Sequence, residues 1–199
     1  MAVSEHPILF TGPMIRSILD GRKTMTRRVV KPQPPVRGAG MRDHKMALAT
    51  DDEGENLRVY SQSAGSGSWS VRCPYGQPGD RLWVKEAITR GYCGDMNMSA
   101  YAADDSPTKA DAWPWKLKTL PAMFCPYGLS RIMLEITGVR VERLQEIGHD
   151  DARAEGVRTD CNGILHLVDF RQLWDDINAK RAPWASNPFV WVIEFRMMK

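Results

Sequence analysis

The sequence predicts a mixed α+β domain in which a β-barrel-like sheet is flanked by short helices. Segments with strand character outnumber helical ones along the 199 residues, and they do not alternate with helices in the rhythm that builds a parallel sheet. One long strand-like segment changes the parity of its apolar positions midway, as a strand that curls around a small barrel does. The length is that of one domain carrying insertions, so we expect residues 1–199 to form a single domain.

The N-terminal part of the chain predicts a strand, a helix and a second strand. Residues 8–10 are a short apolar run that ends at Gly-Pro, which is typical of a buried strand. Residues 13–20 begin with proline and place their apolar side chains on one helical face, and Gly21 can provide the left-handed residue that ends a helix. Residues 24–30 are rich in β-branched side chains and predict a strand.

Two long stretches, at approximately residues 31–67 and 89–128, interrupt this pattern. The first is rich in proline, glycine, serine and charged residues, and only residues 57–60 suggest a hairpin within it. Between the two stretches, residues 81–88 predict a strand that follows a turn. We interpret both stretches as insertions with irregular structure.

The C-terminal part contains the strand with the parity change. Within residues 130–144, apolar side chains occupy even positions as far as Ile136 and odd positions at Val139 and Val141. A β-bulge across residues 137–138 accounts for the change. Further along, the patterns predict a short helix at residues 149–156, a helix at residues 167–177 and a final strand at residues 189–195.

The composition excludes several classes of protein. Hydrophobic residues make up 43% and charged residues 26%, which is typical of a soluble globular chain and not of a disordered, collagen-like or disulfide-rich one. No apolar run is long enough for a transmembrane helix and no signal peptide is visible, so we expect a cytoplasmic protein without membrane contact. The four cysteines lack the Cys-x-x-Cys spacing of a zinc site, so neither a metal nor a cofactor is expected.

The positive charge is concentrated at one end of the chain. Residues 1–45 contain nine lysines or arginines and three acidic residues, so they carry a net charge of +6 and the remainder carries −3. Such a basic region favours an anionic partner, first of all a nucleic acid or a nucleotide, although a solvated basic face accounts for the charge equally well.

The densest cluster of polar and basic residues is Gly-Arg-Lys-Thr-Met-Thr-Arg-Arg at residues 21–28. Lys23 lies at the predicted turn, where its long side chain can fold back toward the hydroxyl of Thr26. A lysine whose pKa is lowered by burial or by neighbouring cations can act as a general base and activate a hydroxyl nucleophile. The alternative is a basic edge strand whose charges only prevent aggregation.

The neighbours of Lys23 in this cluster add two expectations. Strand alternation puts Thr24, Thr26 and Arg28 on one face, so alternation alone does not choose between the two hydroxyls. Arg27 and Arg28 would lower the lysine pKa and attract an anionic substrate. We therefore expect both arginines to contribute to substrate binding.

Glu86 and Trp83, in the strand predicted at residues 81–88, suggest further contacts. Glu86 shares the parity of the apolar residues, so it falls in the core-facing row, where an ionised carboxylate needs a partner. It either pairs with a basic residue near Lys23 or marks the end of the strand. Trp83 falls on the other face, where it either stacks on a nucleobase or packs against the protein. Both are candidate substrate-binding residues.

Carboxylates crowd the short helix predicted at residues 149–156. Asp150 and Asp151 lie near its N-terminus, where negative charge stabilises the helix dipole. Glu155 lies at the opposite end, just before Gly156, where a carboxylate is unfavourable for the dipole. Glu155 is therefore a candidate functional residue, with a solvated surface side chain as the alternative.

Several segments together resemble the ASCH domain family, in particular its longer phage- and prophage-type members. They are residues 7–14, the motif at residues 21–28, the run Tyr-Gly-Gln-Pro-Gly-Asp-Arg-Leu-Trp-Val-Lys-Glu at residues 75–86, and residues 140–145, 152–157, 173–178 and 188–195. The resemblance covers nearly the whole chain except the two insertions. It implies a PUA-like β-barrel fold and a link to RNA or modified nucleosides.

Some small bacterial members of this family are amidohydrolases that remove the acetyl group from N4-acetylcytidine with a threonine, a lysine and a glutamate. Their Gly-x-Lys-Thr-x-Thr-x-Arg motif falls on Lys23, Thr26 and Arg28, and their glutamate falls on Glu155. The resemblance thus implies that Thr26 is the nucleophile and Lys23 the base. It also implies that Glu155 orients the lysine or the leaving amine, and that Arg28 holds the substrate.

The leading prediction is therefore an amidohydrolase acting on the N4-acyl group of cytosine nucleosides such as N4-acetylcytidine. Other family members bind or cleave RNA, so a non-catalytic RNA-binding module is the alternative, and a ribonuclease is a weaker third option. The enzyme needs a closed pocket that brings Lys23, Thr26 and Glu155 within hydrogen-bond reach or one water of each other. The binding module needs an open basic groove with exposed aromatic side chains.

Overall fold

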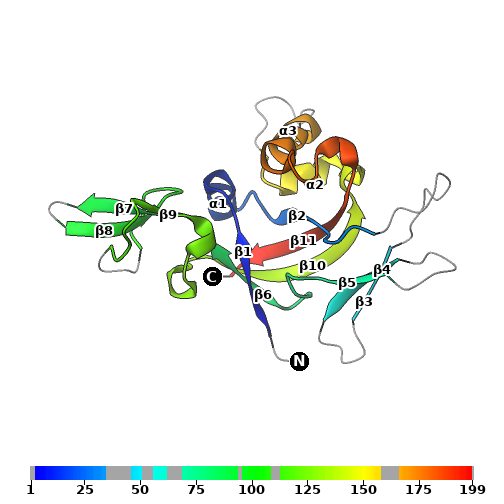
Figure 1. The fold of residues 1–199 in the computed structure, drawn as a ribbon, viewed down its shortest axis with the longest axis horizontal. Coiled ribbons are helices and arrows are strands. Elements are labelled where there is room, and N and C mark those ends of the chain that lie inside the picture. The colour runs from blue at the N-terminus through cyan, green and yellow to red at the C-terminus, as the bar shows by residue number, and fades with distance from the viewer. Residues whose placement is uncertain are drawn as a thin grey trace.

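A computed structural model describes residues 3–34, 46–50, 56–61, 69–93, 96–108, 113–157 and 166–198. Strands predominate over helices in these ranges, which confirms the predicted α+β class (Figure 1). None of the helices within them is both long and apolar enough to cross a membrane.

The centre of the fold is a five-stranded mixed sheet. Across the sheet the strands follow the order β1 (Glu5–Leu9), β6 (Arg81–Lys85), β10 (Met133–Arg143), β11 (Phe189–Met197) and β2 (Met25–Val29). β1 runs parallel to β6, and each of the other neighbouring pairs is antiparallel. The curved sheet is compatible with the β-barrel-like domain that the sequence predicts (Figure 1).

The predicted bulge in β10 is confirmed. Ile136 pairs with Phe195, but the next pair joins Gly138 to Glu194, so Thr137 is an extra residue in β10. The extra residue exchanges the two faces of the strand.

This exchange of faces brings charged side chains to the outer side of the sheet. Beyond the bulge, Val139 and Val141 pack against the main core. Because strand side chains alternate, Arg140 and Glu142 point to the opposite face, where they meet the candidate site described below.

Three helices cover the two faces of the sheet. They are α1 (Gly12–Leu19), α2 (His149–Ala154) and α3 (His166–Asn178), and α2 and α3 lie together on one side (Figure 1). β11 contributes Trp191 and Ile193 to the main core, which α1 also joins, and it contributes Val190 and Val192 to a second core beneath α2 and α3. β11 is therefore buried on both faces, in agreement with the continuous apolar run at residues 189–193.

Two small accessory sheets occupy the predicted insertions. The first contains β3 (Met46–Thr50), β4 (Leu57–Ser61) and β5 (Ser70–Arg72), paired antiparallel in that order. β4 confirms the hairpin expected near residues 57–60. Residues 35–45, 51–55 and 62–68 of the same insertion lie outside the described residues.

The second accessory sheet contradicts the irregular structure expected at residues 89–128. Its strands are β7 (Ile88–Cys93), β8 (Met96–Tyr101) and β9 (Thr119–Leu120), with β7 in the middle, and the sheet projects from the body of the protein (Figure 1). Ile88, Tyr101, Leu120 and Cys125 form a small separate core at its base. These side chains are too widely spaced in the sequence to produce a visible period, so the pattern did not predict the sheet.

Four short 3-10 helices complete the described structure. They are η1 (Ala122–Phe124), η2 (Tyr127–Leu129), η3 (Leu144–Glu146) and η4 (Trp184–Ser186). η1 and η2 follow the second accessory sheet along the chain, and η3 connects β10 to the segment that leads into α2.

Candidate active site

Two glycine turns bring Lys23 and Glu155 together. After α1 the chain passes through Gly21, which is in the left-handed conformation (φ 71°), and then enters β2. After α2 the chain passes through Glu155 and then Gly156, which is also left-handed (φ 82°). Lys23 and Glu155 pair as an isolated antiparallel bridge, although they are 132 residues apart in the sequence. The backbone thus places both candidate catalytic side chains at the same point.

Gly156 determines how closely the two turns approach. A Cβ atom at this position would lie 2.8 Å from the Cβ of Lys23 and 2.9 Å from the Cβ of Ser17. The carbonyl of Gly156 accepts hydrogen bonds from the Ser17 hydroxyl (3.3 Å) and the Arg22 guanidinium (3.2 Å). Any other residue at this position would have to displace Lys23 or Ser17.

The Lys23 amine is completely enclosed by acceptors. Its Nζ donates to Oε2 of Glu155 (2.6 Å), to the carbonyl of Glu155 (2.9 Å) and to the carbonyl of Met25 (2.8 Å), so all three N–H groups of an ammonium are used. Burial lowers the pKa of Lys23 below its ordinary value; Glu155 opposes this effect, and the nearby Arg28 and Arg27 add to it. A buried lysine of lowered pKa beside a carboxylate is suited to proton transfer.

Thr26 is buried in β2, opposite Ile193 of β11. It lines a small cavity of about 60 Å³ together with Glu155 and Arg28. No hydrogen bond joins the Thr26 hydroxyl to Lys23 or Glu155 within the described residues. Of the three predicted catalytic residues, two are therefore in direct contact and the third shares a cavity with one of them.

Thr24 differs from Thr26 more than strand alternation predicts. β2 begins only at Met25, so Thr24 precedes the strand, and its side chain is exposed. The expectation that the two hydroxyls share one strand face is therefore wrong. Its backbone N–H donates to Ala154 (2.9 Å) and its carbonyl accepts from Phe195 (2.9 Å), so Thr24 has a structural role through its main chain.

The small cavity lies between α1, β2 and α3. Besides Thr26, Arg28 and Glu155, one residue of α1, two of β2 and five of α3 line it. They are Met14 of α1, Arg27 and Val29 of β2, and Phe170, Leu173, Trp174, Ile177 and Asn178 of α3. The sequence predicted a helix at residues 167–177, and the apolar side chains of this helix line the cavity. A cavity of this size holds a small group rather than a whole nucleoside.

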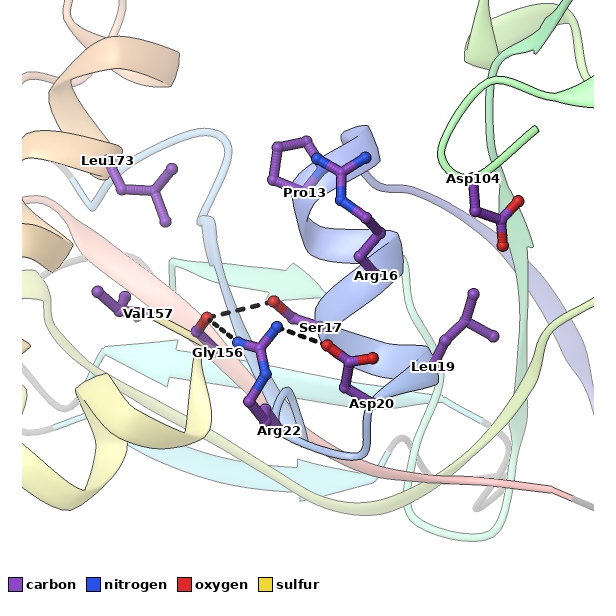
Figure 2. A pocket seen from close by; sticks show the side chains of 10 residues that line it. All are labelled: Pro13, Arg16, Ser17, Leu19, Asp20, Arg22, Asp104, Gly156, Val157 and Leu173. Atoms are coloured by element: carbon purple, nitrogen blue, oxygen red, sulfur yellow. Dashed lines mark hydrogen bonds and ion pairs between the residues drawn. The ribbon is translucent and has the colours of Figure 1, made fainter. Parts of the chain in front are cut away.

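A larger cavity of about 670 Å³ lies beside the first (Figure 2 shows the larger one). Leu173 lines both cavities. Apolar side chains of α1, α3 and the segment after α2 form much of the wall of the larger cavity, with Arg16, Arg22, Asp20 and Asp104 among them. The two arginines are already hydrogen-bonded: Arg16 donates to the carbonyl of Ala103 (2.6 Å), and Arg22 donates to Asp20 (2.8 Å). Equal numbers of positive and negative side chains leave this cavity without net charge.

Arg28 has a buried side-chain donor that makes no hydrogen bond. Its Nη2 donates to the carbonyl of Leu9 at the end of β1 (2.5 Å), and its guanidinium lies 5.1 Å from the centre of the Phe10 ring. Its Nε is buried and makes no hydrogen bond. Burial also lowers the pKa of Arg28 and raises that of the nearby Tyr75. An unpartnered buried N–H beside a cavity is costly unless a ligand oxygen binds it.

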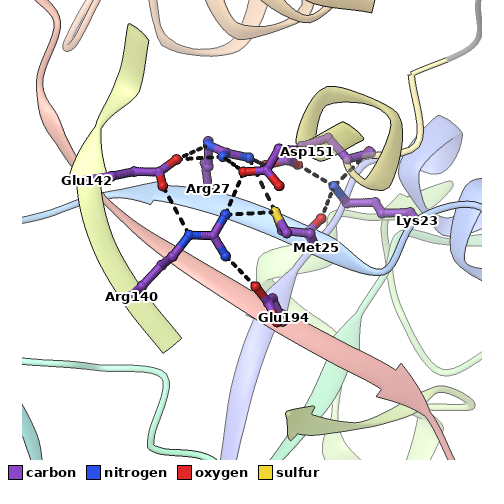
Figure 3. A network of polar contacts seen from close by, with 8 residues as sticks. Lys23, Met25, Arg27, Arg140, Glu142, Asp151 and Glu194 are labelled. Atoms are coloured by element: carbon purple, nitrogen blue, oxygen red, sulfur yellow. Dashed lines mark hydrogen bonds and ion pairs between the residues drawn. The ribbon is translucent and has the colours of Figure 1, made fainter. Parts of the chain in front are cut away.

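Arg27 lies on the opposite face of β2 and is fully committed to protein groups (Figure 3). Its Nη2 donates to Glu142 and Asp151, each at 2.5 Å, and its Nη1 lies 3.4 Å from Oε1 of Glu155 and 3.4 Å from the sulfur of Met25. Its Nε donates to Glu142 as well (3.1 Å), so none of its donors is left for a substrate. The geometry contradicts the predicted substrate-binding role of Arg27, because α2 and α3 cover the face that alternation gave it.

Glu86 is buried but belongs to a different ion pair. Its two carboxylate oxygens accept from Nε (2.8 Å) and Nη2 (2.9 Å) of Arg131, which also binds Asp104 and lies 4.0 Å from the centre of the Tyr101 ring. The prediction that Glu86 pairs with a basic residue near Lys23 is therefore wrong. The strand predicted at residues 81–88 corresponds to β6, which ends at Lys85, so Glu86 marks the end of that strand and lies before β7 begins at Ile88.

Trp83 packs against the protein. Its ring meets that of Tyr127 edge-on, with centres 5.4 Å apart, and the Lys85 amine lies 5.3 Å from its centre. Neither Trp83 nor Glu86 lines either cavity. The structure thus separates these two residues from the group formed by Lys23, Thr26 and Glu155.

Within the described ranges, no group of three or more His, Cys, Asp or Glu side chains could hold a metal ion.

No protein-family model matches the chain, and no curated protein matches it. Among solved structures, the chain is similar to a crystal structure of a protein from Enterococcus faecalis described by the family model DUF984. The two are 8% identical with a TM-score of 0.41, over 100% of this chain and 82% of that chain.

Proposed function

We propose that the protein is a PUA-like, ASCH-type amidohydrolase that removes the N4-acyl group from cytosine nucleosides such as N4-acetylcytidine. The observation that carries the proposal is the buried Lys23–Glu155 pair, joined at 2.6 Å, with Glu155 and Thr26 lining the same cavity. A hydroxyl, an amine of lowered pKa and a carboxylate are the parts that a nucleophilic acyl transfer requires. The resemblance of residues 21–28 to the amidohydrolase motif supports the same roles.

The proposed reaction begins with attack of the Thr26 oxygen on the acyl carbonyl. Lys23 accepts the hydroxyl proton, and it is able to do so because Glu155 can first take one of the ammonium protons across their short hydrogen bond. The free N–H of Arg28 stabilises the developing oxyanion.

Collapse of the tetrahedral intermediate breaks the bond between the acyl carbon and N4. Lys23 returns its proton to N4, so cytidine leaves as a neutral amine and the acyl group remains on Thr26 as an ester. Water then attacks the ester with Lys23 again accepting a proton, and the carboxylic acid is released as Thr26 regains its hydrogen.

The two cavities fit the two parts of such a substrate. The cavity of about 60 Å³ beside Thr26 has room for a small acyl group, and the adjoining cavity of about 670 Å³ has room for a nucleoside. Because the charged side chains around the larger cavity balance and are already paired, an uncharged nucleoside suits it better than a phosphate-bearing one.

The test is a turnover measurement with matched variants. Purified protein is incubated with N4-acetylcytidine and, separately, with an RNA oligomer containing N4-acetylcytidine, and the products are separated by chromatography. We expect cytidine and acetate from the nucleoside. Lys23→Met should abolish the reaction, whereas Lys118→Met, which removes an exposed lysine, should not change it. Absence of product from every N4-acylated cytosine offered to the wild-type protein would rule out the proposed reaction.

One observation favours a second candidate, an RNA-binding module. Phe124 (60% exposed) and Tyr127 (53% exposed) lie near the second accessory sheet, where Lys116 and Lys118 are also exposed. Exposed aromatic rings with lysines nearby suit single-stranded RNA, because bases stack and phosphates pair with cations. Binding of an RNA oligomer should then weaken steeply with salt, and the double change Lys116→Ala and Lys118→Ala should flatten the slope. Salt-independent or undetectable RNA binding would leave only the small-molecule enzyme.

A further inference from the structure

The carboxylate of Glu155 is divided between two cations. Its Oε2 accepts from Lys23 at 2.6 Å, and its Oε1 lies 3.4 Å from Nη1 of Arg27. Arg27 is itself held by Glu142 and Asp151 (Figure 3). The orientation of Glu155 toward the candidate base is therefore fixed by Arg27, which lines the same small cavity but has its donors directed at protein atoms.

We propose that Arg27 is a positioning residue: by binding Oε1 of Glu155 it keeps Oε2 directed at Lys23 and biases which of the two groups holds their shared proton. This role rests on the proposed function of Lys23 and Glu155. It differs from substrate binding, because every donor of Arg27 is directed at a protein atom. It also differs from simple ion pairing, because the charge on Arg27 acts on a carboxylate that contacts the candidate base.

The elements around Arg27 contribute both cations and carboxylates. Lys23 and Arg28 belong to β2 and the turn before it, Asp151 and Glu155 to α2 and its end, Arg140 and Glu142 to β10, and Glu194 to β11. α3 packs against Arg27 through the uncharged ring of Phe170. Arg140 bridges Glu142, Asp151 and Glu194, so it balances the outer part of this network. Arg27 is the cation that reaches from this network to Glu155.

This arrangement gives the direction in which substitutions should act. Without the positive charge of Arg27, the Lys23–Glu155 pair holds its protons more tightly, so Lys23 becomes a free base only at higher pH. Removing the negative charge of Asp151 has the opposite effect, because Arg27 then acts on Glu155 with less compensation. A purely structural role for Arg27 predicts neither shift.

The experiment measures kcat/KM for N4-acetylcytidine against pH, together with the titration of the Lys23 amine by NMR, its signal being identified by loss in Lys23→Met. Arg27→Gln should move both the ascending limb of the profile of kcat/KM against pH and the titration of the Lys23 amine to higher pH, by about one pH unit. Arg27→Lys, which retains the charge, should restore both toward the wild-type values. Asp151→Asn should move both downward. The control is Glu135→Gln, which breaks a surface pair with Arg196 and should move neither.

The outcomes separate this inference from the proposed function. If the wild type hydrolyses the substrate but Arg27→Gln leaves both the limb and the titration in place, the positioning role is overturned. If the wild type has no activity, the proposed function fails, and the NMR titration alone decides whether Arg27 controls the proton on Lys23. If Arg27→Gln does not fold, Asp151→Asn decides, and an unshifted limb and titration in that variant overturn the inference.

Discussion

Replacement of Gly156 by alanine tests how the fold creates the site. The backbone at Gly156 is left-handed, and a Cβ there would lie 2.8 Å from Lys23 and 2.9 Å from Ser17. The left-handed conformation costs a non-glycine residue about 1–2 kcal/mol. Displacing well-packed neighbours costs about 1–3 kcal/mol more. We therefore expect Gly156→Ala to lose about 2–5 kcal/mol of stability and to push Lys23 away from Glu155.

The matched control is Gly21→Ala. Gly21 is also left-handed, but a Cβ there would have nothing within 4 Å, so only the backbone cost of about 1–2 kcal/mol applies. For a chain of this size each kcal/mol corresponds to about 2–4 °C in the unfolding midpoint. Thermal unfolding is followed by circular dichroism, and cytidine release is measured at 25 °C. The unfolding midpoint and the rate of cytidine release should both fall further in Gly156→Ala than in Gly21→Ala. Equal stability of the two variants, with full activity in Gly156→Ala, would refute the close packing of Gly156 against Lys23.

Two other predictions concern groups outside the candidate site. Glu86→Gln breaks the buried pair with Arg131 and should cost about 3–5 kcal/mol of stability in denaturant unfolding. The KM for N4-acetylcytidine should stay unchanged. A changed KM with full stability would mean that Glu86 contributes to the candidate site. Burial raises the pKa of the Cys73 thiol from 9.0 to about 11, so its stabilising contribution is present below pH 9 and is lost as pH rises toward 11. The difference in unfolding free energy between wild type and Cys73→Ala should therefore shrink by about 2–3 kcal/mol across that range, and a constant difference would contradict the burial effect.

Local patterns predicted the elements whose periodicity is strong. The parity change at residues 137–138 predicted the bulge, because an extra residue must exchange the faces of a strand. The apolar residues at residues 167–177 predicted α3, because their spacing puts them on one face of a helix. The pattern at residues 189–195 predicted β11, and its continuous apolar run at residues 189–193 is typical of the burial on both faces that the structure shows.

The candidate site was predictable only where motif and turn chemistry indicated it. Lys23 and Glu155 were selected by a motif and by an unfavourable helix position, and the structure brings them into contact. The two partners of Arg27 could not be predicted from the sequence. Glu142 faces Arg27 because of the bulge in β10, and Asp151 contacts it because of where α2 lies. Glu86 was correctly predicted to need a partner, but Arg131 lies 45 residues further along, beyond any local pattern.

The choice between Thr26 and Thr24 as nucleophile is the most direct test of the proposed chemistry. Thr26 is buried at the small cavity, whereas Thr24 is exposed before the strand. Cytidine release from N4-acetylcytidine should fall by about 10⁴-fold in Thr26→Ala, with circular dichroism showing an intact fold. Thr24→Ala should stay within about twofold of the wild type. Wild-type turnover in Thr26→Ala, or an equal loss in Thr24→Ala, would contradict the assignment of Thr26 as the nucleophile.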